Sequence, residues 1–453
     1  MRREARAVLG HPVIDPTVHA TPLDPLGIVV FALLFCVAAG LARVRPAACI
    51  ALLIACVPFS LSRDIGPTTI TLEKVALLGS ILGLFSYGLG LAALRSPTAR
   101  TIAIAGSVVV AATALSIAHA TYRGAAFRES FKAIEYVMLF ATVVVAARAD
   151  IALRGVALAI YGTVIVVAAL ALAQEFTGAP SGMWFHDRPI PRIAGPLEGP
   201  NQLAGYLGIA LCFLLAAIAV PAGPEERRRP RLARLALGLG LAAEVLTISR
   251  AGLASAAAGL ATVIALAPGR LGRRDALTIA GSVAIGLAVI ALWGLGAAHR
   301  SLAGFALLGH FSSLAESRHA GSVGTRSQLY TAALALWRMH PIFGIGAGNF
   351  ERELGLVGFP ELHTHANSLY VQALVEGGVP LLLATLGLGV VSIAVFARGP
   401  FGDPFVLAAL AASVGFALHQ IGDLLVFFPK VGDLWWILLA LGAARRDAAR
   451  PRA

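Results

Sequence analysis

The sequence contains little charge, few cysteines and no Asp-X-Asp pair. Only 13% of its 453 residues are charged and 58% are hydrophobic, which excludes an ordinary soluble protein. The missing Asp-X-Asp pair argues against a metal-dependent sugar-nucleotide transferase, because such enzymes hold their metal ion with carboxylates. We expect neither disulfides nor a thiolate metal site, because all four cysteines lie in apolar runs: Cys36, Cys49, Cys56 and Cys212.

Long apolar runs fill most of the chain. A bilayer core needs roughly 20 apolar residues of helix, and runs such as 26–42 and 276–297 fit this length. The sequence therefore predicts an all-α protein, a polytopic transmembrane helix bundle of about 12 to 14 spans. The expected spans are 26–42, 46–61, 72–93, 101–118, 131–147, 153–173, 201–220, 232–248, 251–267, 276–297, 379–397, 404–420 and 431–444.

The formal net charge is +12, and most of the arginines lie in short connections between the expected spans. Short basic connections are typical of cytoplasmic loops and of contacts with anionic lipid head groups. We therefore predict membrane lipids, and no nucleic acid, as partners. The connections 221–234 and 268–274 and the C-terminal tail are assigned to the cytoplasm, while the side of the N-terminus stays open.

Four segments follow from this pattern. An N-terminal tail, 1–25, has arginines but no separate apolar core of a signal peptide, and 26–190 holds the N-terminal spans. Residues 191–444 form a second transmembrane region, and 445–453 is a basic cytoplasmic tail. Within the second region a long loop, 298–377, is expected on the external face with short helices. It contains six of the eleven histidines, so it is the expected place of a site.

Two arginines are placed where they could meet an anion. The stretch 325–341 has the apolar periodicity of an amphipathic helix, and Thr325 and Gln328 have capping-box spacing. Arg326 would then lie in the first turn, and Arg250, in TISRAGLASAAAG, lies at the external end of a span. Taken singly, each arginine is better explained by solvent or by lipid head groups.

Two further polar stretches border expected spans. In PRIAGPLEGPNQLAGYL, prolines and glycines surround Arg192 and Asn201, which are expected at the rim of a pocket. In ELHTHANSLYVQALVEGGVP, Asn367 is expected to cap a helix that runs through Glu376 and breaks at the following glycines and proline. The free backbone N–H groups at the start of this helix would face an anion.

Two histidines, His363 and His365, precede this helix. At least one is expected to reach water and titrate near neutrality, as a base or as an anion contact. His365 is closer to the helix start and is the first choice as the base, and the helix end is expected to keep its imidazole neutral. Arginines, a histidine and a helix N-terminus on one face suit an anionic leaving group, such as a lipid diphosphate, that a hydroxyl displaces.

These stretches resemble the O-antigen ligase and O-antigen polymerase superfamily of polytopic enzymes. The resemblance rests on GPLEGPNQLAGYL, SRAG, RSQLYTAALALWRMHPIFGIGAGNF and HTHANSLYVQALVEGGVP, with HQIGDLL and the Trp435–Trp436 span near the end. It implies a glycosyltransferase of the bacterial inner membrane that acts at the periplasmic face on glycans linked to undecaprenyl diphosphate, without a metal or cofactor. By position, it implies that Arg250 and Arg326 bind the donor diphosphate and that a loop histidine is the base.

One departure from the family pattern affects the base. The family commonly has histidine directly before asparagine, whereas here Ala366 separates His365 from Asn367. The choice between His365 and His363 therefore stays open. The acceptor, which could be a glycan, a lipid or a protein, is open too, and with it the choice between ligase and polymerase.

Parts of the sequence also suggest a zinc site, a nucleotide-binding loop or a solute transporter. His363 and His365 could bind zinc, but no cysteine or third ligand at a recognisable spacing accompanies them. The stretch GIGAGNF imitates a nucleotide-binding loop, but no strand precedes it, so a turn is expected. A solute transporter is the alternative from another class, because Glu73, Glu135 and Glu244 lie within or beside spans; no inverted repeat supports it.

Overall fold

The computed structural model describes most of the chain. The described residues are 21–22, 24–59, 61–65, 68–86, 91–150, 153–177, 184–185, 188–189, 192–220, 230–267, 270–298, 322–360, 362 and 364–449.

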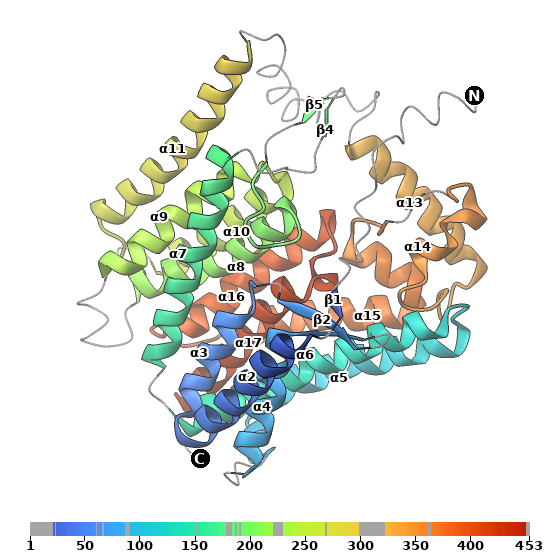
Figure 1. Ribbon diagram of the computed structural model, residues 1–453, viewed down its shortest axis with the longest axis horizontal. Helices are drawn as coiled ribbons and strands as arrows, with labels where there is room; N and C mark the ends of the chain where they lie inside the picture. Colours follow the sequence, from blue (N-terminus) through green and yellow to red (C-terminus); the bar gives the residue numbers. More distant parts are fainter. Residues whose placement is uncertain are drawn as a thin grey trace.

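Helices make up nearly all of the described structure (Figure 1). The α-helices are α2 (Pro25–Val44), α3 (Pro46–Cys56), α4 (Leu72–Ser86), α5 (Pro97–Ser116), α6 (Arg123–Ala149), α7 (Arg154–Thr177), α8 (Pro200–Ala219), α9 (Pro230–Leu246), α10 (Arg250–Leu266), α11 (Arg273–Ala298), α13 (Ser322–Met339), α14 (Phe350–Glu353), α15 (Leu369–Ala397), α16 (Pro404–Gly422) and α17 (Pro429–Ala448). The 3₁₀ helices are η1 (Leu91–Arg95), η2 (Ile117–His119), η4 (Leu354–Val357) and η5 (Leu425–Phe427).

The strands are short and form two small sheets. β1 (Thr21–Pro22) pairs in parallel with β2 (Ser62–Ile65), which pairs antiparallel with β3 (Thr68–Thr71). β4 (Trp184–Phe185) and β5 (Arg188–Pro189) form an antiparallel pair. Each sheet is too small to form a layer of its own, so the helices determine the architecture.

Each expected span lies on one of these helices, which confirms the prediction of an all-α polytopic bundle. Within the described chain, seven helices are long and apolar enough to cross a membrane: α2, α5, α6, α7, α8, α15 and α16. α3 and α10 are shorter apolar helices. α3 ends at Cys56 and not near residue 61, because Pro58 follows and has no backbone N–H to continue the hydrogen bonds of the helix. The total of 12 to 14 crossings stays a prediction.

Ion pairs and helix caps join several helix termini at one end of the bundle, here called the basic end. Arg445, near the end of α17, pairs with Asp403, the N-cap of α16, at 2.7 Å, and Arg234 of α9 pairs with Asp275 of α11 at 2.6 Å. Asp447 accepts the backbone N–H of Thr98 at the start of α5. Since helices alternate in direction, α8, α10 and α15 begin, and α16 ends, at the opposite end, here called the site end.

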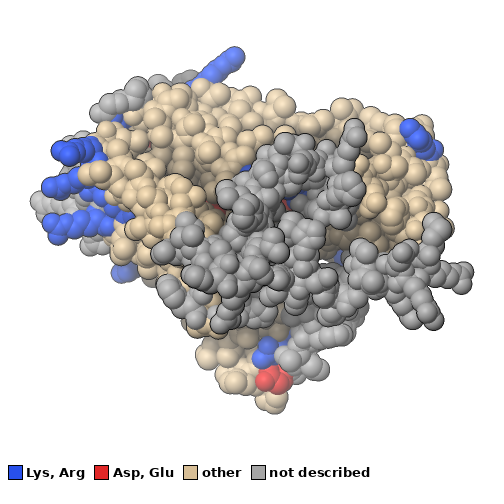
Figure 2. All heavy atoms as spheres, turned by 90° about the horizontal axis from the view of Figure 1, so that it is seen from above, with Lys and Arg blue, Asp and Glu red and all other residues tan. Residues whose placement is uncertain are grey.

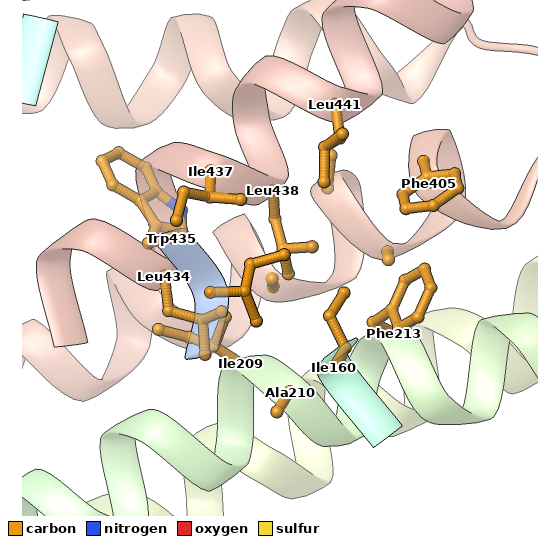
Figure 3. Packing of buried hydrophobic residues seen from close by; sticks show 14 of the residues in the cluster. Ile160, Ile209, Ala210, Phe213, Phe405, Leu434, Trp435, Ile437, Leu438 and Leu441 are labelled. Atoms are coloured by element: carbon orange, nitrogen blue, oxygen red, sulfur yellow. The ribbon is translucent and has the colours of Figure 1, made fainter. Parts of the chain in front are cut away.

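The core lies where α8, α16 and α17 pack together, deep within the bundle. Figure 3 shows Phe213 of α8 against Phe405 of α16, with ring centroids 4.9 Å apart, and the apolar face of α17 beside them. Nearly all of α8 is buried, so this helix is surrounded by other helices and not by lipid. Seen from above in Figure 2, the described surface consists mainly of uncharged residues, with Lys and Arg along its edges.

The described part of the loop forms a small helical layer over α15 at the site end (Figure 1). Leu329, Ala333 and Leu336 of α13 are buried in it, which confirms the predicted apolar face. α13 begins at Ser322, however, so Thr325 does not cap it and Arg326 lies in its second turn. The helix therefore begins about one turn before the expected start.

α15 breaks at Gly378, as predicted, and the stretch GIGAGNF fills the break. Gly378 has a φ of +64°, and a side chain there would collide with the carbonyl of Ile342. The N–H groups of Ile345 and Gly346 bond the carbonyls of Val375 and Glu376 at 3.0 and 2.8 Å. The glycine-rich stretch is therefore a turn, as expected, and not a nucleotide loop. Its N–H groups bond the carbonyls that the break in α15 leaves without a partner in the helix.

Candidate functional site

Three arginines from separate elements come together at the site end. Arg192 precedes α8, Arg250 begins α10 and Arg326 lies on α13. Burial, together with the positive charges of Arg326 and Arg250, lowers the pKa of Arg192 to about 10, and the carboxylate of Asp423 opposes this shift. We call Arg192, Arg250 and Arg326 the arginine cluster. The structure thus joins residues that are 134 positions apart in the sequence, from 192 to 326.

Hydrogen bonds hold the side chain of Arg192 in place. Its Nε donates to the carbonyl of Thr247 at 2.7 Å, and its Nη2 donates to Oδ1 of Asn201 at 2.9 Å. Thr247 lies in the tight connection between α9 and α10, where Ile248 has a φ of +53°. A β-branched residue in this region costs about 1 to 3 kcal/mol, and such strain often marks a functional site. The connection places Arg250 directly after this turn.

The C-terminal end of α16 adds two polar residues that the sequence reading did not select. Asp423 is 5% exposed and its Oδ2 has no partner within the described chain. Burial raises the pKa of this carboxyl, while Arg326, Asn201 and Arg192 favour its charged form. His419 is buried as well and faces Oγ of Ser255 at 3.2 Å. The stretch HQIGDLL was the available signal, but it lies at the end of an apolar run.

The tautomer of His419 follows from its neighbour. Oγ of Ser255 donates its proton to the carbonyl of Gly252 at 2.8 Å, so it can only accept from Nδ1–H of His419. Nε2 of His419 is then a bare acceptor, and it has no partner within the described residues. Two hydrogen-bond acceptors without a partner in the described chain therefore lie near the arginine cluster: Nε2 of His419 and Oδ2 of Asp423.

Residues 235–386 match the family described as O-Antigen ligase. The resemblance to the O-antigen ligase and polymerase superfamily is thereby confirmed, and the match supports a membrane enzyme of this type. No curated protein matches the chain. We call residues 235–386 the O-antigen ligase region. It contains Arg250, Arg326, His363 and His365, whereas Arg192 lies outside it.

His365 of the O-antigen ligase region lies in a cavity of about 710 Å³ between α5, α6, α15, α16 and α17. Its ring centroid is 3.9 Å from that of Phe427. Burial and the positive charge of Lys132 lower the pKa of His365 to about 4, and Glu129 opposes this shift. The imidazole is therefore neutral at pH 7, but His365 does not titrate near neutrality; burial is the main cause, and no helix end is involved.

His365 and the arginine cluster occupy neighbouring but different places. The charges that act on His365 are those of Lys132 and Glu129, and not those of the arginines. The end of α16 contributes to both places, because Gln420 lines the cavity while Asp423 faces the arginines. The N–H of Leu369, the first residue of α15, donates to the carbonyl of Asp423 at 3.0 Å. One of the N–H groups expected to be free at this helix start is thus already bonded.

Three other residues of the loop were singled out in the sequence: Asn367, Glu376 and His363. Asn367 does not cap α15: its φ is +51°, and Ser368 is the N-cap. The carbonyl of Asn367 instead accepts the hydroxyl of Tyr330 at 3.4 Å, which links the loop to the helix of Arg326. Glu376 is buried and accepts the N–H of Phe350 at 3.1 Å, so it supports the turn within the break. His363 lies outside the described residues.

Proposed function

We propose that the protein is a glycosyltransferase of the O-antigen ligase or polymerase type in the bacterial inner membrane, with its active side external. It transfers a glycan from an undecaprenyl-diphosphate-linked donor to an acceptor hydroxyl. The observation that carries this proposal is the arginine cluster within and beside the O-antigen ligase region. Membrane lipids surround the bundle.

The arginine cluster is suited to a diphosphate. Three cations share one partly buried place beside the carboxylate of Asp423. Like charges in such a place repel each other, so an anion with several oxygens would be favoured there. Guanidinium groups bind phosphate oxygens through paired hydrogen bonds. They also stabilise the charge that develops on the leaving diphosphate.

The reaction is a displacement at the anomeric carbon. The acceptor oxygen forms a bond to this carbon, while the bond from the carbon to the diphosphate oxygen breaks and the electron pair leaves with the diphosphate. His365 takes the proton of the acceptor hydroxyl. General-base catalysis of this kind contributes about 10²- to 10⁴-fold. The protein supplies the positive charge for the leaving group through its arginines, so the proposal includes no metal and no cofactor.

Deletion of the gene, followed by gel analysis of the cell's glycans, tests this function. Loss of long chains with single repeats retained indicates a polymerase, and loss of all attachment indicates a ligase. Either result would agree with the proposed chemistry, because both reactions need the same anion site and base. Intact glycans together with altered solute uptake would contradict the proposal and favour the transporter reading.

The low pKa of His365 leads to a prediction about pH. The neutral base predominates above pH 4, so transfer should not lose its base between pH 8 and pH 5. Replacing Lys132 with Gln removes a charge that lowers this pKa and leaves Glu129, which raises it. The acid limb of the pH–rate profile should therefore move upward, toward the ordinary histidine range.

Lys74→Gln is the matched control for this shift. Lys74 lines the same cavity, but it is not among the charges that act on His365. Its profile should keep the acid limb of the wild type. Identical limbs in wild type and Lys132→Gln would show that His365 does not control the rate.

A further inference from the structure

The helical layer over α15 exposes two large apolar side chains where α13 ends. Met339 is the last residue of this helix and is 53% exposed, and Ile342 follows it and is 62% exposed. Neither belongs to the buried core of the layer. Single exposed apolar residues are ordinary on a protein surface, so their position relative to the membrane decides what they mean. We call residues 337–342 the turn segment.

The length of α15 gives the level of the turn segment in the membrane. α15 ends at Ala397, at the basic end, and from there back to the break at Gly378 it has about 20 residues, or about 30 Å of helix. The hydrocarbon core of a bilayer has this thickness, so the break lies at its external boundary. A Cβ on Gly378 would meet the carbonyl of Ile342, which places the turn segment directly beside the break.

α5 gives the same level independently. It has 20 residues and begins at the basic end, so it reaches the external boundary where it ends, at Ser116. The 3₁₀ helix η2 follows, and the ring of its His119 stacks on Phe343, with ring centroids 4.9 Å apart. Oγ of Ser116 accepts the N–H of Ala347 at 3.0 Å. The chain that leaves the turn segment is therefore held at the external end of α5.

The lipid-facing surface of both helices reaches the same level. α5 and α15 are long and apolar enough to cross a membrane, so their exposed apolar side chains face lipid. Leu115, at the end of α5, and Val379, directly after the break in α15, are both exposed. Met339 and Ile342 thus extend an apolar surface that already contacts the acyl chains.

The backbone of the turn segment is suited to a place with little water. The carbonyl of Trp337 accepts the N–H of His340 at 3.0 Å, and the carbonyl of His340 accepts the N–H of Gly344 at 2.9 Å. The indole N–H of Trp337 donates to the carbonyl of Pro341 at 3.0 Å. Because these carbonyls are already bonded, removing water from them costs little free energy. Tryptophan is also enriched at the level of the head groups.

We propose that the turn segment is an interfacial anchor that inserts Met339 and Ile342 into the external leaflet of the membrane. Its partner is the lipid surface, at the boundary between the acyl chains and the head groups. The layer then rests on the membrane as well as on the bundle, and the anchor fixes the level of α13, the helix that carries Arg326. The inference does not depend on the transfer reaction, because it concerns only where the layer lies relative to lipid.

Spin labels measure this depth directly. Of the four cysteines only Cys36 is exposed, so the Cys36→Ala protein takes a label only where a further cysteine is introduced. Labels are attached to Met339→Cys and Ile342→Cys, to Val379→Cys as the lipid-facing reference, and to Thr331→Cys as the exposed reference on α13. The purified protein is studied in phosphatidylcholine vesicles. Collisions of each label with oxygen, which dissolves among acyl chains, are compared with collisions with a water-soluble nickel complex.

We expect the labels at positions 339 and 342 to lie about 5 to 10 Å below the head groups, in contact with oxygen and protected from nickel. The label at position 331 should be accessible to nickel. Ile342→Asp and Thr331→Asp then form a matched pair, because both side chains are exposed and neither change opens a cavity. Ile342→Asp should move a label at position 339 into the nickel-accessible region, since a carboxylate is costly in lipid. Thr331→Asp should leave that label in place.

Three outcomes would overturn the anchor. Nickel access at position 342 equal to that at position 331 would show that the turn segment faces water. Protection of position 342 from both oxygen and nickel would show that a second copy of the chain covers it, since the vesicles contain no other protein. An unchanged depth at position 339 in Ile342→Asp would show that Ile342 does not hold the segment in lipid. A label at Val379→Cys in the Ile342→Asp protein should keep its depth, which checks that the bundle is folded.

Discussion

Replacing Arg326 with lysine is expected to reduce glycan transfer by about 100-fold or more, although the positive charge is kept. A guanidinium binds two phosphate oxygens at once through a rigid pair of donors, whereas an ammonium acts as a point charge. Loss of one well-placed donor to a developing anion typically costs about 10²- to 10³-fold in rate. The rate should be measured with purified protein and a lipid-diphosphate-linked glycan, and compared at matched protein levels.

Arg338→Lys is the control, because Arg338 lies on the same helix, α13, but is exposed. It should leave transfer unchanged. Arg326→Lys should also weaken binding of undecaprenyl diphosphate alone, since the diphosphate is the part that Arg326 contacts. Near-normal transfer by Arg326→Lys at normal expression would show that this arginine does not bind the donor.

The helices could be predicted from the sequence because their signal is local. A run of apolar residues long enough to cross a bilayer can only satisfy its backbone there as a helix, so each expected span became one. The break at Gly378 was equally local, because glycines and a proline cannot continue a helix without strain. The first residue of each helix was harder to predict from the sequence. α13 begins at Ser322, before the capping-box spacing, and α15 begins at Leu369, whose N–H bonds the distant carbonyl of Asp423.

The site could be predicted only in part. Topology alone indicated that Arg192, Arg250 and Arg326 share one end of the bundle, and the structure brings them together. Asp423 was missed, because a polar residue that ends an apolar run reads as a simple helix end. The surroundings of His365 were also misjudged. Lys132 lies 233 positions before it in the sequence, and no local pattern reveals that contact.

Replacing His365 with alanine is expected to abolish transfer, by about 10²- to 10⁴-fold, while the protein still folds. The imidazole is neutral and lies in the cavity where the acceptor hydroxyl is proposed to bind. His363→Ala should have a milder effect. Activity of the wild type should survive chelators, because the proposed step uses arginines and an imidazole. Transfer assays on both variants, with thermal unfolding as the check on folding, give the comparison.

Addition of free imidazole to His365→Ala distinguishes the loss of the base from a change in the shape of the cavity. Removing the ring beside Phe427 leaves a space into which free imidazole can bind, so partial rescue of His365→Ala would identify proton transfer as the missing function. The opposite ranking of the two variants would move the base to His363. If both variants stay active, neither His363 nor His365 takes the proton. Asp423 would then be the group to test, because it is a buried carboxylate beside the arginines, and burial makes a carboxylate a stronger base.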